Sequence, residues 1–215
     1  MLTAIIDYES GNLHSAEKAF QRMAAEVGAG EVVVTSDADV VARADRLVLP
    51  GVGGVRACMN ELRRLELNEL VQEVAKTKPL MGICLGMQVM LEHSEENGGV
   101  DALGIIKGTV RRFPDPPADP EGRRLKVPHM GWNRVRQAQP DHPLWTGIPD
   151  NTWFYFVHSY HVVLGRASDA LGTSDYVHPF TAALARDNVA AFQFHPEKSQ
   201  AMGIRVLGNF VEWSP

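Results

Sequence analysis

The sequence predicts an α/β fold of three layers, in which a mostly parallel sheet is flanked by helices and additional antiparallel strands occupy the C-terminal half. Up to residue 93, short apolar runs alternate with helical patterns, which is typical of a parallel sheet covered on both faces. After residue 93, strand patterns follow one another with only turns between them, which indicates antiparallel pairing. The 215 residues contain no internal repeat or change in composition, so we expect a single domain over residues 1–215.

The first half should contain four strands, each a short and almost continuously apolar run. These strands are expected at residues 2–8, 31–35, 46–49 and 80–83. Helices are expected at residues 13–27, from the glycine-rich segment 51–54 to about residue 76, and at residues 85–91. This alternation forms the parallel half of the predicted sheet.

The second half should contain the antiparallel strands and a final helix. Strands are expected at residues 104–113, 125–129, 133–136, 152–164, 181–186 and 189–194. The helix is expected at about residues 201–211. Residues 114–120 are polar and rich in proline, which favours an exposed loop.

Composition and charge exclude several classes of protein. Hydrophobic residues make up 45% of the chain, as in ordinary globular domains, and a net charge of −5 without a basic stripe argues against a nucleic-acid partner. Two cysteines, Cys58 and Cys84, are too few for a disulfide framework. The N-terminus does not have the pattern of a signal peptide, and no apolar run is long enough to span a membrane. We therefore expect a soluble, cytoplasmic protein.

The segment 82–86 carries the strongest chemical signal. It reads Gly-Ile-Cys-Leu-Gly, with Cys84 between a predicted strand and a predicted helix. Gly-x-Cys-x-Gly is the cysteine form of the nucleophile elbow, a tight strand-to-helix turn that exposes a nucleophile above the sheet. The positive end of the helix dipole would favour the thiolate. Taken alone, the segment fits a small buried thiol equally well, and Cys58, which has no elbow around it, is expected to be one.

His195 and Glu197 supply the partners that a nucleophilic thiol needs. They follow a predicted strand, where side chains two residues apart face the same way, and Pro196 is expected to keep the backbone between them extended. One imidazole nitrogen would then face Cys84 while the carboxylate holds the other, which predicts a Cys–His–acid triad. The alternative is a core histidine that is satisfied by a nearby carboxylate.

The predicted chemistry also requires an oxyanion site, because a thiolate that attacks an amide creates a negative oxygen. One N–H donor is normally that of the residue after the nucleophile, here Leu85, and the second comes from a neighbouring strand–helix loop. The candidate is the loop from Gly51 to Gly53, which includes Val52, because glycines expose their amides and permit unusual φ; viewed alone, the loop fits a plain glycine turn equally well. Gln88 lies one helical turn after Cys84 and could contact a small polar substrate, or it could be a solvated helix residue.

No metal or cofactor is expected. His158, His161, His195 and Cys84 could in principle gather a zinc ion, but the sequence has no metal-type spacing such as Cys-x-x-Cys or His-Glu-x-x-His. The segment 51–54 likewise fits neither the dinucleotide pattern nor the P-loop pattern.

These motifs together resemble those of the class I, triad-type glutamine amidotransferases. The elbow at residues 82–88 and the His-Pro-Glu segment at 195–197 carry the resemblance to this superfamily. Finer motifs are similar to those of the glutaminase subunits of imidazole glycerol phosphate synthases, and they lie at residues 7–12, 50–53, 128–133, 155–160 and 195–199. Nearly the whole chain is covered. Glu9 departs from the pattern, which has a glycine there, and so does the proline-rich segment.

The resemblance implies that the chain hydrolyses glutamine. Cys84 would form a γ-glutamyl thioester, His195 would act as base and acid, and Glu197 would orient His195. By the same resemblance, the oxyanion donors would be Val52 and Leu85, and the residues that hold glutamine would be Gln88, Ser159 and Tyr160. A peptide flanked by glycines in the loop 51–53 could rotate its N–H towards or away from the oxyanion, which would make the isolated chain a poor glutaminase.

The resemblance also implies a partner. Ammonia would pass to a separate (β/α)₈ cyclase subunit, in a heterodimer that makes imidazole glycerol phosphate and an aminoimidazole carboxamide ribotide in histidine biosynthesis. Asn12, Trp132 and Lys198 would lie near this subunit, with Lys198 meeting an acidic residue. Two other interpretations are a stand-alone thiol hydrolase, of the cysteine peptidase or γ-glutamyl hydrolase type, and a catalytically silent interaction subunit. The intact triad argues against the silent subunit.

Overall fold

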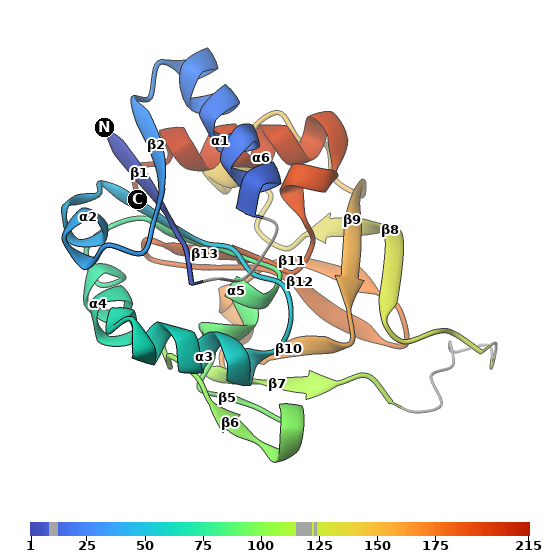
Figure 1. Ribbon diagram of the computed structural model, residues 1–215. Helices are drawn as coiled ribbons and strands as arrows, with labels where there is room; N and C mark the ends of the chain where they lie inside the picture. Colours follow the sequence, from blue (N-terminus) through green and yellow to red (C-terminus); the bar gives the residue numbers. More distant parts are fainter. Residues whose placement is uncertain (9–12, 115–121, 123) are drawn as a thin grey trace.

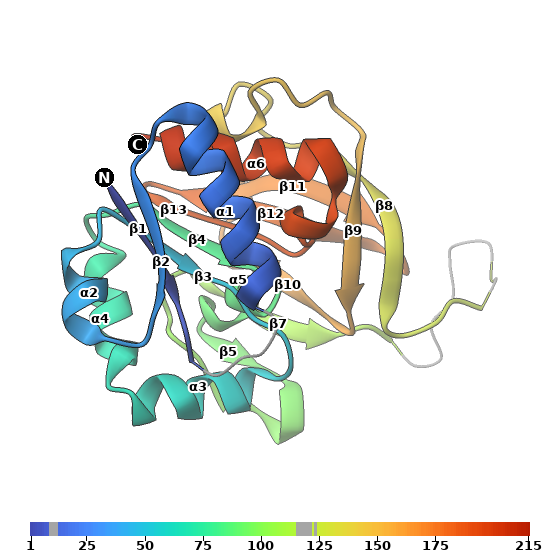
Figure 2. The same ribbon diagram turned by 45° about the horizontal axis from the view of Figure 1, so that its top comes forward.

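The computed structural model describes residues 1–8, 13–114, 122 and 124–215. A mixed sheet lies between two layers of helices, with α1 (Leu13–Val27) and α6 (Gln200–Glu212) on one face (Figure 1). The other face carries α3 (Val55–Arg64), α4 (Leu67–Val74) and α5 (Leu85–Val89). Figure 2 shows α1 and α6 lying across this sheet side by side. The predicted three-layer α/β fold is confirmed.

Five neighbouring strands form the main parallel part of the sheet, in the order β2-β1-β3-β4-β13. They are β1 (Leu2–Ile6), β2 (Glu31–Thr35), β3 (Arg46–Leu49), β4 (Leu80–Ile83) and β13 (Val189–Phe192). Three of the predicted strands have these bounds, and the first ends two residues earlier than predicted. The last strand was predicted to be antiparallel and to reach residue 194. Instead, it ends at Phe192, is antiparallel only to β12 (Pro179–Arg186), and runs parallel to β4.

The remaining strands extend the sheet beyond β12, and they differ most from prediction. They are β5 (His93–Ser94), β6 (Val100–Asp101), β7 (Gly108–Arg112), β8 (His129–Gln137), β9 (Thr152–His158), β10 (Tyr160–Leu164) and β11 (Ala170–Asp175). The strand predicted from residue 104 starts at Gly108, because Gly104 adopts a left-handed turn with φ +66°. The predicted strands 125–129 and 133–136 are replaced by β8, and the strand 152–164 is divided into β9 and β10. The proline-rich segment lies largely outside the described residues.

Two short features of the helical layer were missed. The helix predicted to run to residue 76 is divided, because Glu66 has a left-handed backbone with φ 57° that ends α3 and starts α4. The short helix α2 (Ala38–Arg43) was not predicted. Its N-terminus is capped by the Asp37 side chain, which accepts from two backbone N–H groups, and only Val41 on it is buried. Four single 3₁₀ turns complete the described chain: η1 (Glu96–Gly98), η2 (Pro143–Trp145), η3 (Ala167–Asp169) and η4 (Pro196–Lys198).

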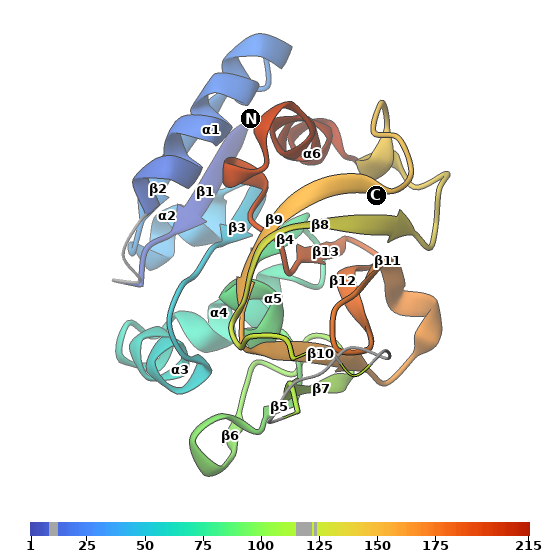
Figure 3. The same ribbon diagram turned by 90° about the vertical axis from the view of Figure 1, so that its right-hand side faces the viewer.

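The sheet separates two hydrophobic cores, because successive strand side chains point to opposite faces. On β1, Ile5 packs into the core under α1 and α6 together with Phe20 and Phe210. Its neighbours Ala4 and Ile6 pack into the core under α2 to α5. Within the described ranges, no helix has the length and hydropathy that crossing a membrane requires. The strand pair β8 and β9 curves across the side of the molecule that faces the viewer in Figure 3, and β8 joins the sheet by pairing with β11.

Candidate active site

Cys84 occupies the predicted strand-to-helix turn between β4 and α5. Its φ of 53° is a left-handed backbone conformation that a non-glycine residue rarely adopts. The two glycines of the elbow are required by space. A Cβ on Gly82 would lie 2.9 Å from the backbone of Gly86, and a Cβ on Gly86 would overlap the carbonyl oxygen of Leu49. The turn therefore holds Cys84 in a strained position at the carboxyl edge of the sheet, where reactive residues of α/β folds commonly lie.

His195 and Glu197 form a buried pair next to this turn. The distance from His195 Nδ1 to Glu197 Oε1 is 2.7 Å, and the two side chains are only 3% and 7% exposed. The prediction of an extended backbone between them was wrong, because Pro196 starts the 3₁₀ turn η4. The turn is held by the Ser199 hydroxyl, which donates to the His195 carbonyl at 2.6 Å. The pair therefore forms through a tight turn, not through the alternation of a strand.

The charge state of His195 is set by its two neighbours. Burial lowers the pKa of His195, but the contacts with Cys84 and with the Glu197 carboxylate outweigh this effect and raise the pKa from 6.5 to about 10. The second nitrogen, Nε2, is buried and makes no standard hydrogen bond to a described residue, so it is available to the sulfur. A histidine of this kind is an imidazolium at neutral pH, with Cys84 on one side and a carboxylate on the other.

One cavity of about 330 Å³ brings the predicted catalytic, oxyanion and substrate residues together. The exception is Glu197, which bonds His195 but does not line the cavity. The cavity is lined by Val52, Gly53, Cys84, Leu85, Gln88, Glu96, Pro128, Val157, His158, Ser159, Tyr160 and His195. Its volume suits a single small polar molecule.

The predicted oxyanion site is closed by the loop that should form it. The N–H of Leu85 donates to the carbonyl oxygen of Gly51 at 3.4 Å, so this donor is already used. Residue 51 must be a glycine, because a Cβ there would overlap the hydroxyl of Tyr8. This hydroxyl donates to the Pro50 carbonyl at 2.6 Å and so holds the start of the loop. Gly53 has φ +99°, a conformation that favours glycine. The loop therefore lies at the predicted place, with a carbonyl where a second donor is needed.

Gln88 is not a solvated helix residue, because only 6% of it is exposed. Its Nε2 donates to the Tyr160 carbonyl at 3.2 Å and to Gln193 Oε1 at 3.1 Å. The amide of Gln193 in turn lies 3.8 Å from the sulfur of Cys84. Gln193 was not predicted as a site residue, although a polar residue between Phe192 and Phe194 in an apolar strand end is a signal for a buried contact.

Glu96 is the second missed residue. It lines the cavity, and its Oε2 accepts the N–H of Val55 at the start of α3 at a distance of 2.7 Å. Nothing in the polar segment 95–99 distinguishes Glu96 from its neighbours in the sequence, since its role depends on β5 and η1 placing it beside the glycine loop. A carboxylate in this wall is suited to a cationic group of a ligand.

The predicted interface residues have separate positions. Trp132 is 43% exposed on β8, with its ring against Tyr155, and Met130 on the same strand is 62% exposed. Lys198 is exposed and directly follows Glu197. Asn12 and Glu9 lie outside the described residues. No metal is expected from the sequence. Among the residues that the structure describes, no group of three or more histidine, cysteine, aspartate or glutamate side chains could hold a metal ion.

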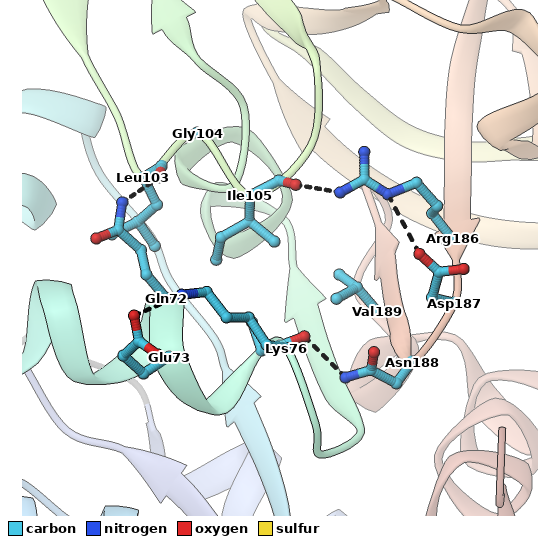
Figure 4. Close-up of a pocket in the computed structure, with 11 residues that line it drawn as sticks. Gln72, Glu73, Lys76, Leu103, Gly104, Ile105, Arg186, Asp187, Asn188 and Val189 are labelled. Atoms are coloured by element: carbon cyan, nitrogen blue, oxygen red, sulfur yellow. Dashed lines mark hydrogen bonds and ion pairs between the residues drawn. The ribbon is translucent and has the colours of Figure 1, made fainter.

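A larger cavity, of about 630 Å³, lies at the opposite edge of the sheet (Figure 4). Lys76 and Asn188, which line it, precede β4 and β13, whereas Cys84 and His195 follow these strands. Its polar side chains already have partners: Gln72 donates to the Leu103 carbonyl, Lys76 pairs with Glu73, Asn188 donates to the Ala75 carbonyl and Arg186 to the Ile105 carbonyl. The cavity contains no nucleophile, so size does not identify the reactive site here.

The comparisons with known proteins agree with this geometry. A family model described as "Glutamine amidotransferase class-I" matches residues 4–213. A protein from Methylococcus capsulatus named "Imidazole glycerol phosphate synthase subunit HisH" is 54% identical over 212 residues, which cover 99% of this chain and 96% of that protein. A protein of the same name from Ruegeria pomeroyi is 54% identical over 218 residues, with both chains fully covered.

Solved structures share the fold at low sequence identity. A putative GMP synthase protein from Thermoplasma acidophilum has a TM-score of 0.68 and 18% identity, with 99% of this chain and 92% of that chain covered. The CTPS glutaminase domain from Trypanosoma brucei, solved with bound acivicin, has a TM-score of 0.67 and 15% identity, with 100% and 95% covered. The extent and identity of the sequence matches establish that this chain belongs to the class-I glutamine amidotransferase family and, within it, to the HisH subunits of imidazole glycerol phosphate synthase.

Proposed function

We propose that this chain hydrolyses glutamine to glutamate and ammonia and delivers the ammonia to a separate (β/α)₈ cyclase subunit. The heterodimer then makes imidazole glycerol phosphate and an aminoimidazole carboxamide ribotide in histidine biosynthesis. The observation that carries the proposal is the position of His195, which contacts Cys84 and forms a 2.7 Å hydrogen bond with Glu197 at the wall of a small cavity. The family membership supplies the reaction class.

The proposed reaction proceeds in two steps. The Cys84 thiolate attacks the side-chain carboxamide carbon of glutamine, and the carbonyl oxygen becomes an oxyanion. The His195 imidazolium then gives its proton to the leaving nitrogen, so that ammonia departs and a γ-glutamyl thioester remains. In the second step, neutral His195 accepts a proton from water as the water attacks the thioester, and glutamate leaves with Cys84 restored. Glu197 stabilises the imidazolium whenever it forms.

Glutamine is held by groups around the cavity. Gln88, Ser159 and Tyr160 line it and can hydrogen-bond the carboxamide and the α-carboxylate. Glu96 faces the same space and is suited to the α-ammonium group, since a charge-assisted hydrogen bond between opposite charges discriminates well against neutral ligands. This set would distinguish glutamine from a peptide, whose corresponding nitrogen is an uncharged amide.

The closed oxyanion site implies that the isolated chain is a poor glutaminase. The Leu85 N–H is bonded to the Gly51 carbonyl, so the oxyanion lacks a free donor until the peptide after Gly51 rotates. Loss of one oxyanion donor lowers kcat by about 10²–10³-fold. Rotation would remove the Gly51 carbonyl from Leu85 and turn the N–H of Val52 towards the substrate.

The cyclase subunit would supply this activating step by docking beside the cavity. Lys198 directly follows Glu197 and is exposed, and Trp132 presents an aromatic surface on β8. Lys198 is suited to an acidic residue of the partner, with Asn12 in the same interface. We place this assembly in the cytoplasm, where reducing conditions keep thiols such as Cys58 and Cys84 free of disulfides.

The test compares glutamate release by the isolated chain, by the complex with the cyclase, and by the complex with a ligand in the cyclase site. We expect low release from the isolated chain and a large increase in the liganded complex. Full activity in the isolated chain, with peptides or γ-glutamyl conjugates accepted, would favour a stand-alone hydrolase. Absence of glutamate release under all three conditions would favour the silent interaction subunit.

A further inference from the structure

A chain of hydrogen bonds runs beside the cavity, and in every bond the donor lies on the same side, so that each group donates to the next. His158 Nδ1 lies 2.7 Å from the Tyr160 carbonyl, and because a carbonyl only accepts, this nitrogen carries the proton. Burial lowers the pKa of His158 to about 3, so the ring is neutral and its Nε2 is an acceptor. His129 Nδ1, 2.8 Å from this Nε2, must then be the donor. The network thus assigns one tautomer to each ring.

The same direction continues beyond His129. Burial lowers the pKa of His129 to about 4, so this ring is also neutral and its Nε2 accepts from the Asn133 amide at 3.3 Å. The amide of Asn133 also donates to the Asp175 carbonyl at 2.7 Å, which fixes its orientation. The full chain is therefore Asn133 to His129 to His158 to the Tyr160 carbonyl.

Packing holds the His129 ring in this position. His129 and His158 face each other as cross-strand partners on β8 and β9, and both are buried. The His129 ring stacks on Tyr176 with 4.0 Å between centroids and on Phe156 with 5.0 Å. A ring held on its faces cannot easily rotate to exchange its two nitrogens, so the direction of the chain is built into the packing.

The Tyr160 carbonyl is the junction between this chain and the nucleophile. It accepts from His158 and also from Gln88, which donates to Gln193. Gln193 in turn donates to the Cys84 sulfur at 3.8 Å. His158 and Tyr160 both line the cavity, so the chain fixes its wall as well as the support of the thiol. No part of the proposed reaction uses His129.

We propose that His129 is a positioning residue for glutamine hydrolysis: by donating to His158 it fixes the Tyr160 carbonyl and the Gln88–Gln193 bridge that holds Cys84. This inference rests on the proposed function of the cavity.

The first experiment tests the chain itself and needs no activity. Nitrogen NMR of the isolated, ¹⁵N-labelled protein should show a scalar coupling across the N–H···N bond from His129 Nδ1 to His158 Nε2. His161 is the internal control, because it is buried and stacked on Phe113, with an Nδ1 that makes no hydrogen bond to any described residue. Absence of the coupling, or a proton on His158 Nε2, would overturn the inference.

The second experiment uses the complex with the cyclase and a rescue series. His129→Leu keeps the volume but leaves His158 Nε2 buried without a donor, so kcat/KM for glutamine should fall about tenfold, the cost of one buried hydrogen bond. His129→Asn places an amide donor near the lost Nδ1 and should recover activity to within about threefold of wild type, by the same arithmetic. His161→Phe, which keeps the stack on Phe113, should leave kcat/KM unchanged.

Two outcomes separate this inference from the proposed function. If the wild-type complex hydrolyses glutamine and the His129→Leu and His129→Asn variants both match it, the positioning role is wrong while the function stands. If the wild-type complex releases no glutamate, the function is wrong. The labelling rate of Cys84 by a glutamine-like electrophile then decides the positioning role: a slower rate in His129→Leu with recovery in His129→Asn supports it, and equal rates contradict it.

Discussion

Glu197→Gln isolates the contribution of the carboxylate, because glutamine keeps the shape of the side chain and can still accept from His195 Nδ1. The native bond is 2.7 Å long between side chains that are 3% and 7% exposed, so solvent screens it weakly. A hydrogen bond to a charged group is worth about 1–2 kcal/mol more than a neutral one, which corresponds to roughly a 5- to 30-fold loss in kcat. His195→Ala removes the acid and base entirely, and its loss should be larger.

The pH dependence provides the sharper readout. The folded-state pKa of His195 is raised from 6.5 to about 10 by its contacts with Cys84 and Glu197. This raised pKa contributes stability that is fully present below about pH 6.5 and lost as the pH rises through about 10. Removing the carboxylate charge lowers the pKa, so glutamine hydrolysis should lose its acid at a lower pH in Glu197→Gln. The stability difference from wild type should be largest near pH 6.5, where the raised pKa contributes in full, and should fade as the pH rises through about 10.

The assay is a pH series of kcat for glutamate release by the complex, with thermal unfolding of each variant measured at the same pH values. Glu95→Gln is the matched control, because Glu95 is an exposed glutamate that lies 3.7 Å from Arg111. It should match wild type in both measurements. Equal losses for Glu197→Gln and His195→Ala, or an unchanged high-pH limb in Glu197→Gln, would refute the reasoning.

Two further substitutions test the nucleophile and the substrate contacts. Cys84→Ala should abolish glutamate release, while the complex still makes product from ammonium salts; a glutamine-like electrophile should label Cys84 and leave Cys58 unmodified, because burial raises the pKa of Cys58 to about 12. Retained glutaminase activity in Cys84→Ala would contradict the triad. Glu96→Gln should raise KM for the substrate glutamine about tenfold or more, which is the cost of losing one charge-assisted bond. It should change kcat little, since the introduced side chain can still accept the Val55 N–H. An unchanged KM would remove Glu96 from the substrate contacts.

Much of the parallel half of the fold could be predicted from the sequence. The strands at residues 46–49 and 80–83 are almost continuously apolar and buried throughout, as parallel strands covered on both faces require. The strand at residues 31–35 has three consecutive valines, although it lies at the edge of the sheet and is only partly buried. The short elements could not be predicted, because a six-residue helix such as α2, with one buried side chain, leaves no periodic pattern. The strand β11 was missed for a related reason: Gly172 and Ser174 are buried by tertiary packing although neither is a strand-forming residue type.

The candidate site was predictable in its parts but not in its connections. The glycines around Cys84 and the spacing of His195 and Glu197 are local, and local patterns remain visible in a sequence. The 3₁₀ turn that joins the pair was not foreseen, since two different backbones bring the same side chains together. The bond between the Leu85 N–H and the Gly51 carbonyl could not be foreseen either, because a glycine-flanked peptide has no orientation fixed by its sequence.

The most direct test of the account is to trap the covalent intermediate. The complex is given glutamine, quenched in acid within the first turnovers and digested, and the peptides that contain Cys84 and Cys58 are examined by mass spectrometry. The account predicts a γ-glutamyl group on the Cys84 peptide of the wild-type protein and none on either peptide of Cys84→Ala. Two results would contradict this account. One is glutamate release by wild type with no adduct on Cys84 under conditions that preserve thioesters, and the other is an adduct on Cys58.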